Sequence, residues 1–150
     1  MKRKLTLFLA LCLSMVALAE QVVVQTSGLS LVLDVVKGQQ PKYVYFGSKL
    51  SALELQHLQF PAVSGRMDAY PAHGLNTPAE AALAMRHADG NLSTALYADG
   101  VEQNGNMTVI TLKDPVYPTT VKLNYKTYPE VDLIETWAEI TNGEKQTVTL

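Results

Sequence analysis

The chain has 150 residues, of which 47% are hydrophobic and 17% charged, so it is long and apolar enough to bury the core of one globular domain. The formal net charge is −2, and the sequence contains no basic cluster of the kind that phosphate backbones or anionic membranes attract. Composition therefore excludes an intrinsically disordered chain, argues against nucleic-acid binding and favours a neutral ligand.

The first 19 residues have the pattern of a secretory signal peptide. Positions 2–4 are basic, 5–16 are apolar, and a small-x-small cleavage site ends at Ala19. We expect cleavage after Ala19, export to the periplasm or the extracellular space, and no membrane attachment of the product. Losing three basic residues would move the formal charge from −2 to −5. The only cysteine, Cys12, lies in this segment, so the remaining domain, residues 20–150, would depend on burial and hydrogen bonding without disulfides.

Three β-type runs follow at the short spacing typical of a sandwich. The Val-rich residues 21–25 and the run 29–36 are separated by a Ser-Gly pair, and a turn at 38–41 leads into the aromatic run 43–46. These runs predict three strands joined by short turns.

Residues 50–74 predict a long loop, because two prolines limit any helix there to a turn or two. Long ordered loops on sheet scaffolds are common places for binding groups. The pair Thr77-Pro78 then has the pattern of a helix start, whereas residues 81–86 could equally form a strand, which we favour.

Residues 107–150 have the composition of a strand ladder, rich in Val, Ile, Thr and Tyr, and turn residues at 104–106 precede it. Within 121–128, every second side chain suits a buried face, whereas the residues between them are mostly polar. The residues of the buried face are Val121, Leu123, Tyr125 and Thr127.

The next run, 131–142, carries apolar side chains on both faces, which predicts a central strand covered on both sides. Trp137 lies midway along it, and we expect this ring in the core rather than as a sugar-stacking platform. Residues 146–149 predict a further strand that continues past Leu150, which would leave the sandwich incomplete at its C-terminal end.

The sequence offers no obvious catalytic centre. The acidic residues Glu130, Asp132, Glu135 and Glu139 lie on the 131–142 run or at its entry, and alternation puts Asp132 on the face opposite Glu135 and Glu139, so we interpret them as solvated strand charges. The histidines lie in separate segments with no second ligand at metal spacing, so we expect no metal. No Gly-rich phosphate loop or nucleophile elbow is present, and we expect no cofactor.

Several pieces of the sequence occur in a particular order: VYFG at 44–47, YPAHG at 70–74, RHADG at 86–90, ITLKDP at 110–115, LNY at 123–125 and the long run 131–143. In this order they resemble the N-terminal β-sandwich domain of family 36 glycoside hydrolases, the α-galactosidases. The resemblance covers about residues 28–150. It implies an all-β, antiparallel, supersandwich-like fold.

The resemblance also implies an activity for the whole enzyme. Family members remove terminal α-linked galactose from oligosaccharides with retention, using two aspartates on a (β/α)-barrel that this sequence lacks. We therefore expect no catalytic residue here, and a domain that packs on the barrel, shapes the mouth of its active site and helps to assemble homo-oligomers.

The resemblance implies candidate substrate-binding residues in the 65–74 loop, since loops of this sandwich reach the mouth of a barrel, often in a neighbouring subunit. Asp68 is the candidate residue to bind a galactose hydroxyl. Glu54 is the second choice, because the loop is shorter than in the family and the alignment can shift between the two. Tyr70 and His73 would lie at the rim. The alternative is that Tyr70 and its neighbours only fix the loop and that Asp68 is solvated.

Two other classes of protein compete with this interpretation. A stand-alone carbohydrate-binding module would show an exposed aromatic platform, and a structural or adhesion domain would associate with itself without affinity for sugars.

Overall fold

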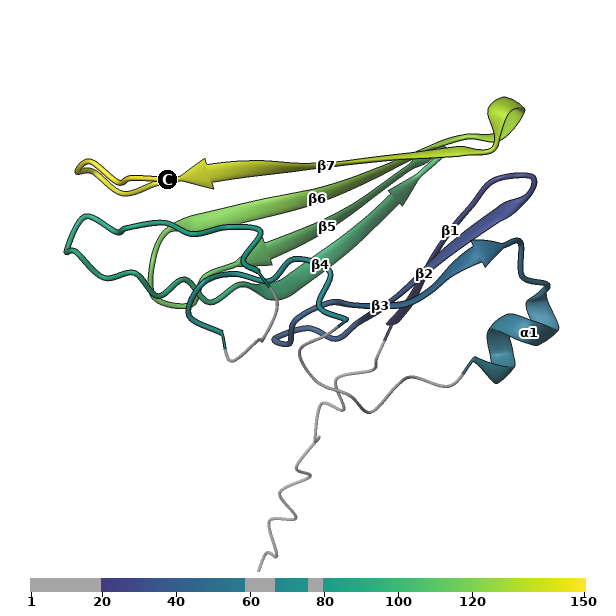
Figure 1. Ribbon diagram of the computed structural model, residues 1–150, viewed down its shortest axis with the longest axis horizontal. Coiled ribbons are helices and arrows are strands. Elements are labelled where there is room, and N and C mark those ends of the chain that lie inside the picture. The colour runs from purple at the N-terminus through teal and green to yellow at the C-terminus, as the bar shows by residue number, and fades with distance from the viewer. Residues whose placement is uncertain (1–19, 59–66, 76–79) are drawn as a thin grey trace, which may run out of the picture.

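The computed structural model describes residues 20–58, 67–75 and 80–150 as two antiparallel sheets stacked on each other, with one short helix at the side (Figure 1). The predicted all-β, antiparallel sandwich is confirmed. The predicted signal peptide and the helix start at Thr77-Pro78 lie outside the described residues. Within the described ranges, no helix is long and apolar enough to cross a bilayer.

The first sheet has the order β1-β2-β3 and comes from one stretch of chain. Its strands are β1 (Glu20–Gln25), β2 (Leu29–Val35) and β3 (Lys42–Ser48). Thr26 closes the first turn, where its hydroxyl accepts the amide of Leu29 at 3.0 Å. All three strands agree with the sequence prediction to within two residues.

The second sheet has the order β4-β5-β6-β7. Its strands are β4 (Tyr97–Asn104), β5 (Met107–Lys113), β6 (Thr119–Tyr128) and β7 (Leu133–Asn142). A single turn of 3-10 helix, η1 (Pro129–Val131), joins β6 to β7. Gly105, with φ of 58°, makes the predicted turn between β4 and β5. The sequence analysis missed most of β4, whose pairing with β5 shifts register between Ala98 and Gly100.

The helix α1 (Ala52–His57) is short, as the prolines around it require. Ser51 caps it: its hydroxyl accepts the amide of Glu54 at 3.3 Å, and its own amide donates to Glu54 Oε2 at 2.8 Å. Glu54 is therefore engaged in its own helix cap.

The core lies between the two sheets, where branched and aromatic side chains of β1, β2, β5 and β6 meet. On β6 the predicted alternation is confirmed, with one addition: Asn124, on the opposite face, is also buried. The inner-face core residues are Val22, Val24, Leu31, Leu33, Val35, Ile110, Leu112, Val121, Leu123 and Tyr125.

The hairpin ends of the two sheets are joined at one end of the sandwich. Asp132, in the left-handed conformation with φ of 48°, accepts the amide of Gly28 at 2.6 Å. Ser27 also donates to the carbonyl of Pro129 at 3.2 Å. The β1–β2 turn is thereby fixed to the β6–β7 connection, and Asp132 belongs to this turn rather than to a strand.

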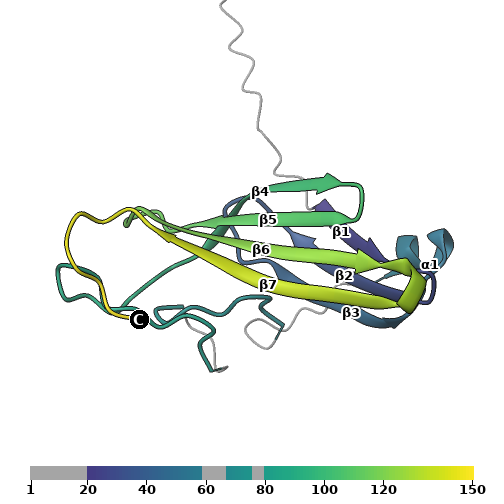
Figure 2. The same ribbon diagram turned by 90° about the horizontal axis from the view of Figure 1, so that it is seen from above.

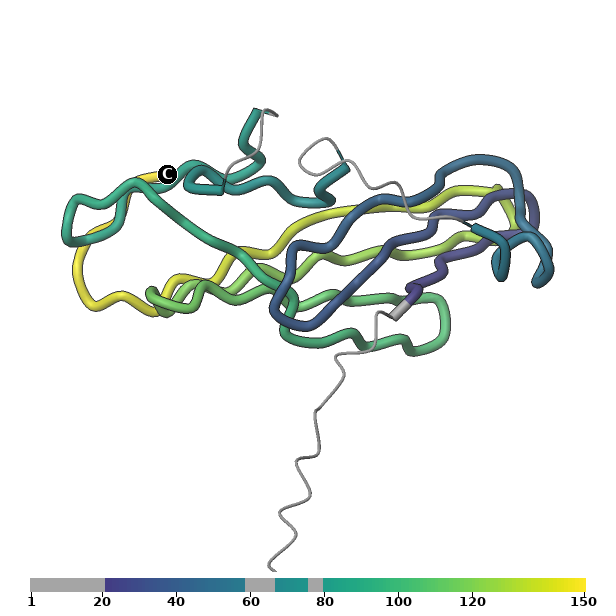
Figure 3. The backbone as a smooth tube through the Cα atoms, turned by 90° about the horizontal axis from the view of Figure 1, so that it is seen from below, coloured from purple at the N-terminus to yellow at the C-terminus, as the bar shows by residue number. Residues whose placement is uncertain are grey.

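Two strand predictions, for residues 81–86 and 146–149, were wrong. Residues 81–86 have alternate side chains buried at Leu83 and Met85, but they form only isolated bridges such as Ala72 with Leu83. Residues 146–149 likewise make a single bridge, between Thr149 and Arg86. Figure 3 shows the chain end beside the segment that carries Arg86. Neither run forms a strand, because neither has a neighbour that pairs with it along its length.

The prediction that the 131–142 run is a central strand was also wrong for the described residues. β7 lies at the edge of its sheet, next to β6, and nearly all of its residues are exposed (Figure 2). β7 carries apolar side chains on both of its faces, but the described residues do not bury both faces.

Candidate functional site

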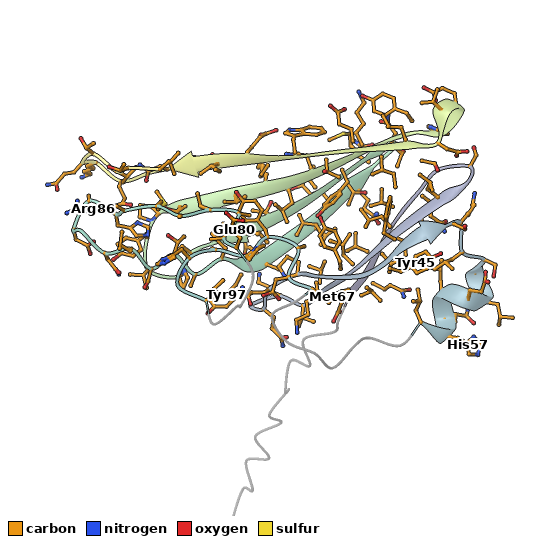
Figure 4. All side chains as sticks on the ribbon, viewed as in Figure 1. Tyr45, His57, Met67, Glu80, Arg86 and Tyr97 are labelled. Carbon is orange, nitrogen blue, oxygen red and sulfur yellow. The ribbon has the colours of Figure 1, made fainter. Side chains whose placement is uncertain are left out.

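A cleft of about 560 Å³ opens between β3 and β7 along the side of the sandwich. Its walls are mostly apolar, because they come from the inner faces of two edge strands and from Met67, which lies near Tyr45 (Figure 4). The lining residues include Leu31, Tyr43, Phe46, Met67, Ile134 and Thr136. A cleft of this size and lining suits an apolar or aromatic-rich contact rather than a charged ligand.

The segment 67–70 forms one end of this cleft because it pairs with the start of β3. The amide of Tyr43 donates to the carbonyl of Met67 at 2.7 Å, and the amide of Ala69 donates to the carbonyl of Pro41 at 2.8 Å. This pairing places Asp68 opposite Lys42. Asp68 Oδ1 is buried and has no hydrogen-bond partner among the described residues.

Tyr70 lines a second, smaller cavity of about 180 Å³ at the free edge of β7, together with Tyr43, Asn124 and Trp137. Partial burial raises the pKa of the Tyr70 phenol. The hydroxyls of Tyr43 and Tyr125 lie 3.5 Å apart, and burial strongly raises the pKa of Tyr125. With their pKa values raised, the phenols of Tyr70 and Tyr125 stay protonated at neutral pH and can act as neutral hydrogen-bonding groups.

The structure does not bring all the predicted site residues together. Asp68 and Tyr70 share one segment beside β3, whereas His73 is exposed and its Nδ1 contacts the carbonyl of Leu92 at 3.0 Å. His73 lines a separate hollow that includes Arg86, which lies at the far end of the molecule from Tyr45 (Figure 4). Glu54, on α1, caps its own helix, and hydrogen bonds from the amide and hydroxyl of Ser51 lower the pKa of its carboxyl group.

A buried chain of polar groups, which the sequence analysis missed, lies at this far end. His87 Nδ1 is 2.8 Å from Glu144 Oε1, and His87 Nε2 is 2.9 Å from Thr94 Oγ1. The imidazole also stacks on Tyr117, with ring centroids 3.5 Å apart. The order hydroxyl, imidazole, carboxylate resembles a catalytic triad, but Thr94 is 0% exposed, so no substrate can reach its hydroxyl. The chain of groups fixes two loops together. The sequence signal that could have revealed it is the period of two in residues 83–87, which places His87 on the same face as Leu83 and Met85.

No group of three or more potential metal ligands occurs in the described part of the chain. The carboxylates on β7 each have a local hydrogen-bond donor: Tyr128 for Glu135, at 2.9 Å, and Trp137 for Glu139, at 3.0 Å. These two carboxylates are therefore engaged in hydrogen bonds on their own sheet.

The prediction that Trp137 is buried in the core was wrong. The side chain is on the face of β7 opposite to the cleft, paired across the strands with Asn124, and Trp137 is 38% exposed. The pattern of apolar residues in 131–142 alone could not predict the exposure of Trp137, because burial depends on which elements cover each face of a strand.

The two stacked antiparallel sheets define an all-β, sandwich-like domain. Residues 39–150 match the glycosyl hydrolase family 36 N-terminal domain, and the chain belongs to this family. No curated protein matches the sequence.

Solved structures of similar fold come from α-galactosidases. One is the α-galactosidase from Lactobacillus brevis, with 17% identity over 87% of this chain and 22% of that chain, at a TM-score of 0.68. Another is a variant of AgaA from Geobacillus stearothermophilus in complex with stachyose, with 16% identity over 86% of this chain and 23% of that chain, at a TM-score of 0.71. A third, AgaB from the same organism, has 17% identity and a TM-score of 0.66, and the match covers 87% of this chain and 22% of AgaB. The chain thus spans less than a quarter of the length of these proteins.

Proposed function

We propose that this chain is the N-terminal, non-catalytic domain of an exported α-galactosidase. In that enzyme a separate barrel domain would remove terminal α-linked galactose from oligosaccharides by retaining hydrolysis. The observation that carries the proposal is the match of residues 39–150 to the family 36 N-terminal domain, together with the sandwich fold.

The uncovered apolar surface supports the proposal that this domain packs on another part of the enzyme. Phe46, on β3 at the cleft, is 68% exposed. Ile140, on β7, has its side chain on the inner face of the second sheet and is 40% exposed. Together with the mostly apolar cleft beside Phe46, these side chains offer apolar surface for contact with another domain. The same surface is available for contacts between subunits, and we propose that the enzyme is a homo-oligomer.

The segment 67–70 is the part of the domain that we propose for the mouth of the active site. Asp68 has a buried carboxylate oxygen without a partner among the described residues, and Tyr70 lies at the adjoining cavity. A carboxylate and a phenol can accept and donate hydrogen bonds to galactose hydroxyls. His73 belongs to the same stretch of chain but lies at a different hollow, which makes it the weakest of the three candidates.

The native mass of the protein tests this proposal. Mass spectrometry of the protein recovered intact from the exported fraction of its source should give several times the 16.4 kDa of this sequence, because a barrel domain has to follow. A mass equal to that of residues 20–150 would overturn the proposal. A stand-alone carbohydrate-binding or structural domain would then be the better assignment, and the exposure of Trp137 favours the former.

A further inference from the structure

The outer face of β6 and β7 carries the only tryptophan of the chain, Trp137, at its exposed surface. Tryptophan is usually well covered in folded proteins, so an exposed indole in the middle of a regular strand is unusual. The cleft between β3 and β7 lies on the other face of the sheet, and the small cavity that Trp137 and Asn124 line together with Tyr70 lies at the edge of β7 between the two.

The indole is fixed in place by hydrogen bonds on the sheet. Trp137 Nε1 donates to Glu139 Oε1 at 3.0 Å, and Asn124 Nδ2 donates to the same oxygen at 3.2 Å. Asn124 is itself only 4% exposed and also contacts the carbonyl of Lys122 at 3.2 Å. Since the indole has no polar atom besides Nε1, its exposed surface is apolar and aromatic.

Hydrogen-bond donors and hydrogen-bond acceptors flank the ring of Trp137. The register pairs Lys122 with Glu139 on one side of Trp137 and Lys126 with Glu135 on the other. The ammonium groups donate and the carboxylates accept, and their charges balance, so the surface has no preference for an anion or a cation.

This arrangement differs from the centre of a protein–protein interface. Charged residues are depleted there, whereas two lysines and two glutamates surround this single ring. A pyranose has the complementary chemistry: one face of C–H groups that packs on an aromatic ring, and a rim of neutral hydroxyls that both donate and accept hydrogen bonds.

We propose that the surface around Trp137, with Asn124, Glu139 and Lys122, binds a neutral pyranose such as a galactoside. The ring of Trp137 would stack on the C–H face of the sugar, and Glu139 and Lys122 would contact its hydroxyls. This site goes beyond the function proposed above. Its stacking and hydrogen-bonding residues belong to β6 and β7, and Trp137 and Asn124 also line the small cavity beside Tyr70.

Titration of the purified protein with methyl α-D-galactopyranoside tests the site, with the fluorescence of the only tryptophan as the readout. We expect a saturable change in intensity or wavelength, with a dissociation constant on the order of 1 mM, as is usual for a ligand of so few atoms. Calorimetry of the same titration provides a readout that does not depend on the indole. Absence of saturation by both methods would overturn the proposal.

Three variants separate stacking from folding. Trp137→Ala should abolish the calorimetric signal, Trp137→Phe should retain binding within about tenfold because it keeps an aromatic face, and Glu139→Gln should weaken binding while leaving the ring in place. Val116→Ala, at an exposed side chain away from the site, is the matched control and should bind as the wild type does. Equal binding by Trp137→Ala and wild type would overturn the proposal.

The full-length native protein gives the last test. This test uses the full-length protein with any tryptophan other than Trp137 replaced. Acrylamide should quench the fluorescence of Trp137 in the absence of sugar, and added sugar should protect the indole from quenching. An indole shielded without sugar would mean that another part of the polypeptide covers this face, and the proposal would be wrong. The native mass and this titration are independent, so failure of the α-galactosidase proposal is distinguishable from failure of the sugar site.

Discussion

At the scale of single residues, the buried imidazole of His87 makes a close polar contact with the partly buried carboxylate of Glu144. His87 is 2% exposed, and Glu144 accepts both its ring N–H and the amide of Ala88, at 3.0 Å. The hydrogen bonds from His87 and Ala88 lower the pKa of Glu144 below its ordinary value of 4.5. A neighbouring carboxyl, Asp89, has its pKa lowered in the same way by the amide of Asn91 and the hydroxyl of Tyr117.

These lowered pKa values predict loss of stability in acid. A carboxyl group whose pKa is lower in the folded state stabilises the fold above its unfolded pKa, and the contribution disappears as the pH falls through the folded pKa. For Glu144 this loss begins as the pH drops below about 4.5. Urea unfolding between pH 7 and pH 3 should show it, and Glu144→Gln should flatten the dependence. An equally steep dependence in Glu144→Gln would contradict the assignment to this carboxylate.

At the scale of elements, the contact of Asp132 with Gly28 links the turns of two different sheets. Asp132→Ala removes the carboxylate and places alanine at a positive φ, which disfavours most side chains. We expect a loss of about 1–2 kcal/mol in the free energy of unfolding. Asp132→Asn keeps an acceptor and a residue that tolerates this conformation, so it should lose less than half as much. Equal losses in the two variants would show that the hydrogen bond is not the cause.

The inner face of β5 provides a second prediction at this scale. Ile110 is completely buried between the sheets, and Ile110→Ala should lower the free energy of unfolding by about 2–5 kcal/mol, because it leaves a cavity in a closely packed core. Trp137→Ala should cost clearly less than the 3–5 kcal/mol typical of a buried aromatic side chain, since more than a third of Trp137 is already exposed. Chemical denaturation of both variants checks the order, and a larger loss for Trp137→Ala would indicate that the indole is buried.

The sequence predicted those elements whose signal is local. The alternation in 121–128 predicts β6 because each inner side chain meets the core, and turn residues mark the ends of β1, β2 and β5. β4 was missed because Gly100 and its polar neighbours have low strand propensity and interrupt the register. The interpretation of Trp137 was wrong because apolar residues on both faces of a strand do not specify what covers them. The pairing of 67–70 with β3 depends on contacts between distant segments, so Asp68 and Tyr70 could be placed by family resemblance alone.

At the scale of the whole molecule, the family match is to an N-terminal domain, and the proposed catalytic barrel is a separate domain. The purified chain should therefore release no nitrophenol from p-nitrophenyl α-D-galactopyranoside above the rate of an enzyme-free blank. The control is a characterised α-galactosidase assayed at the same molar concentration. Measurable hydrolysis that copurifies with the chain would contradict the assignment of a non-catalytic domain.

The order of the strands has a consequence for how the chain folds. Each sheet is built from strands that are consecutive in the sequence, so each can form by closing short hairpin loops. The contact between Gly28 and Asp132 spans 104 residues, and such links can form only when the two sheets come together. During synthesis the first sheet is complete long before its partner exists, and its inner valines and leucines stay exposed in the meantime. The docking of the two sheets is therefore the step at which folding competes with aggregation.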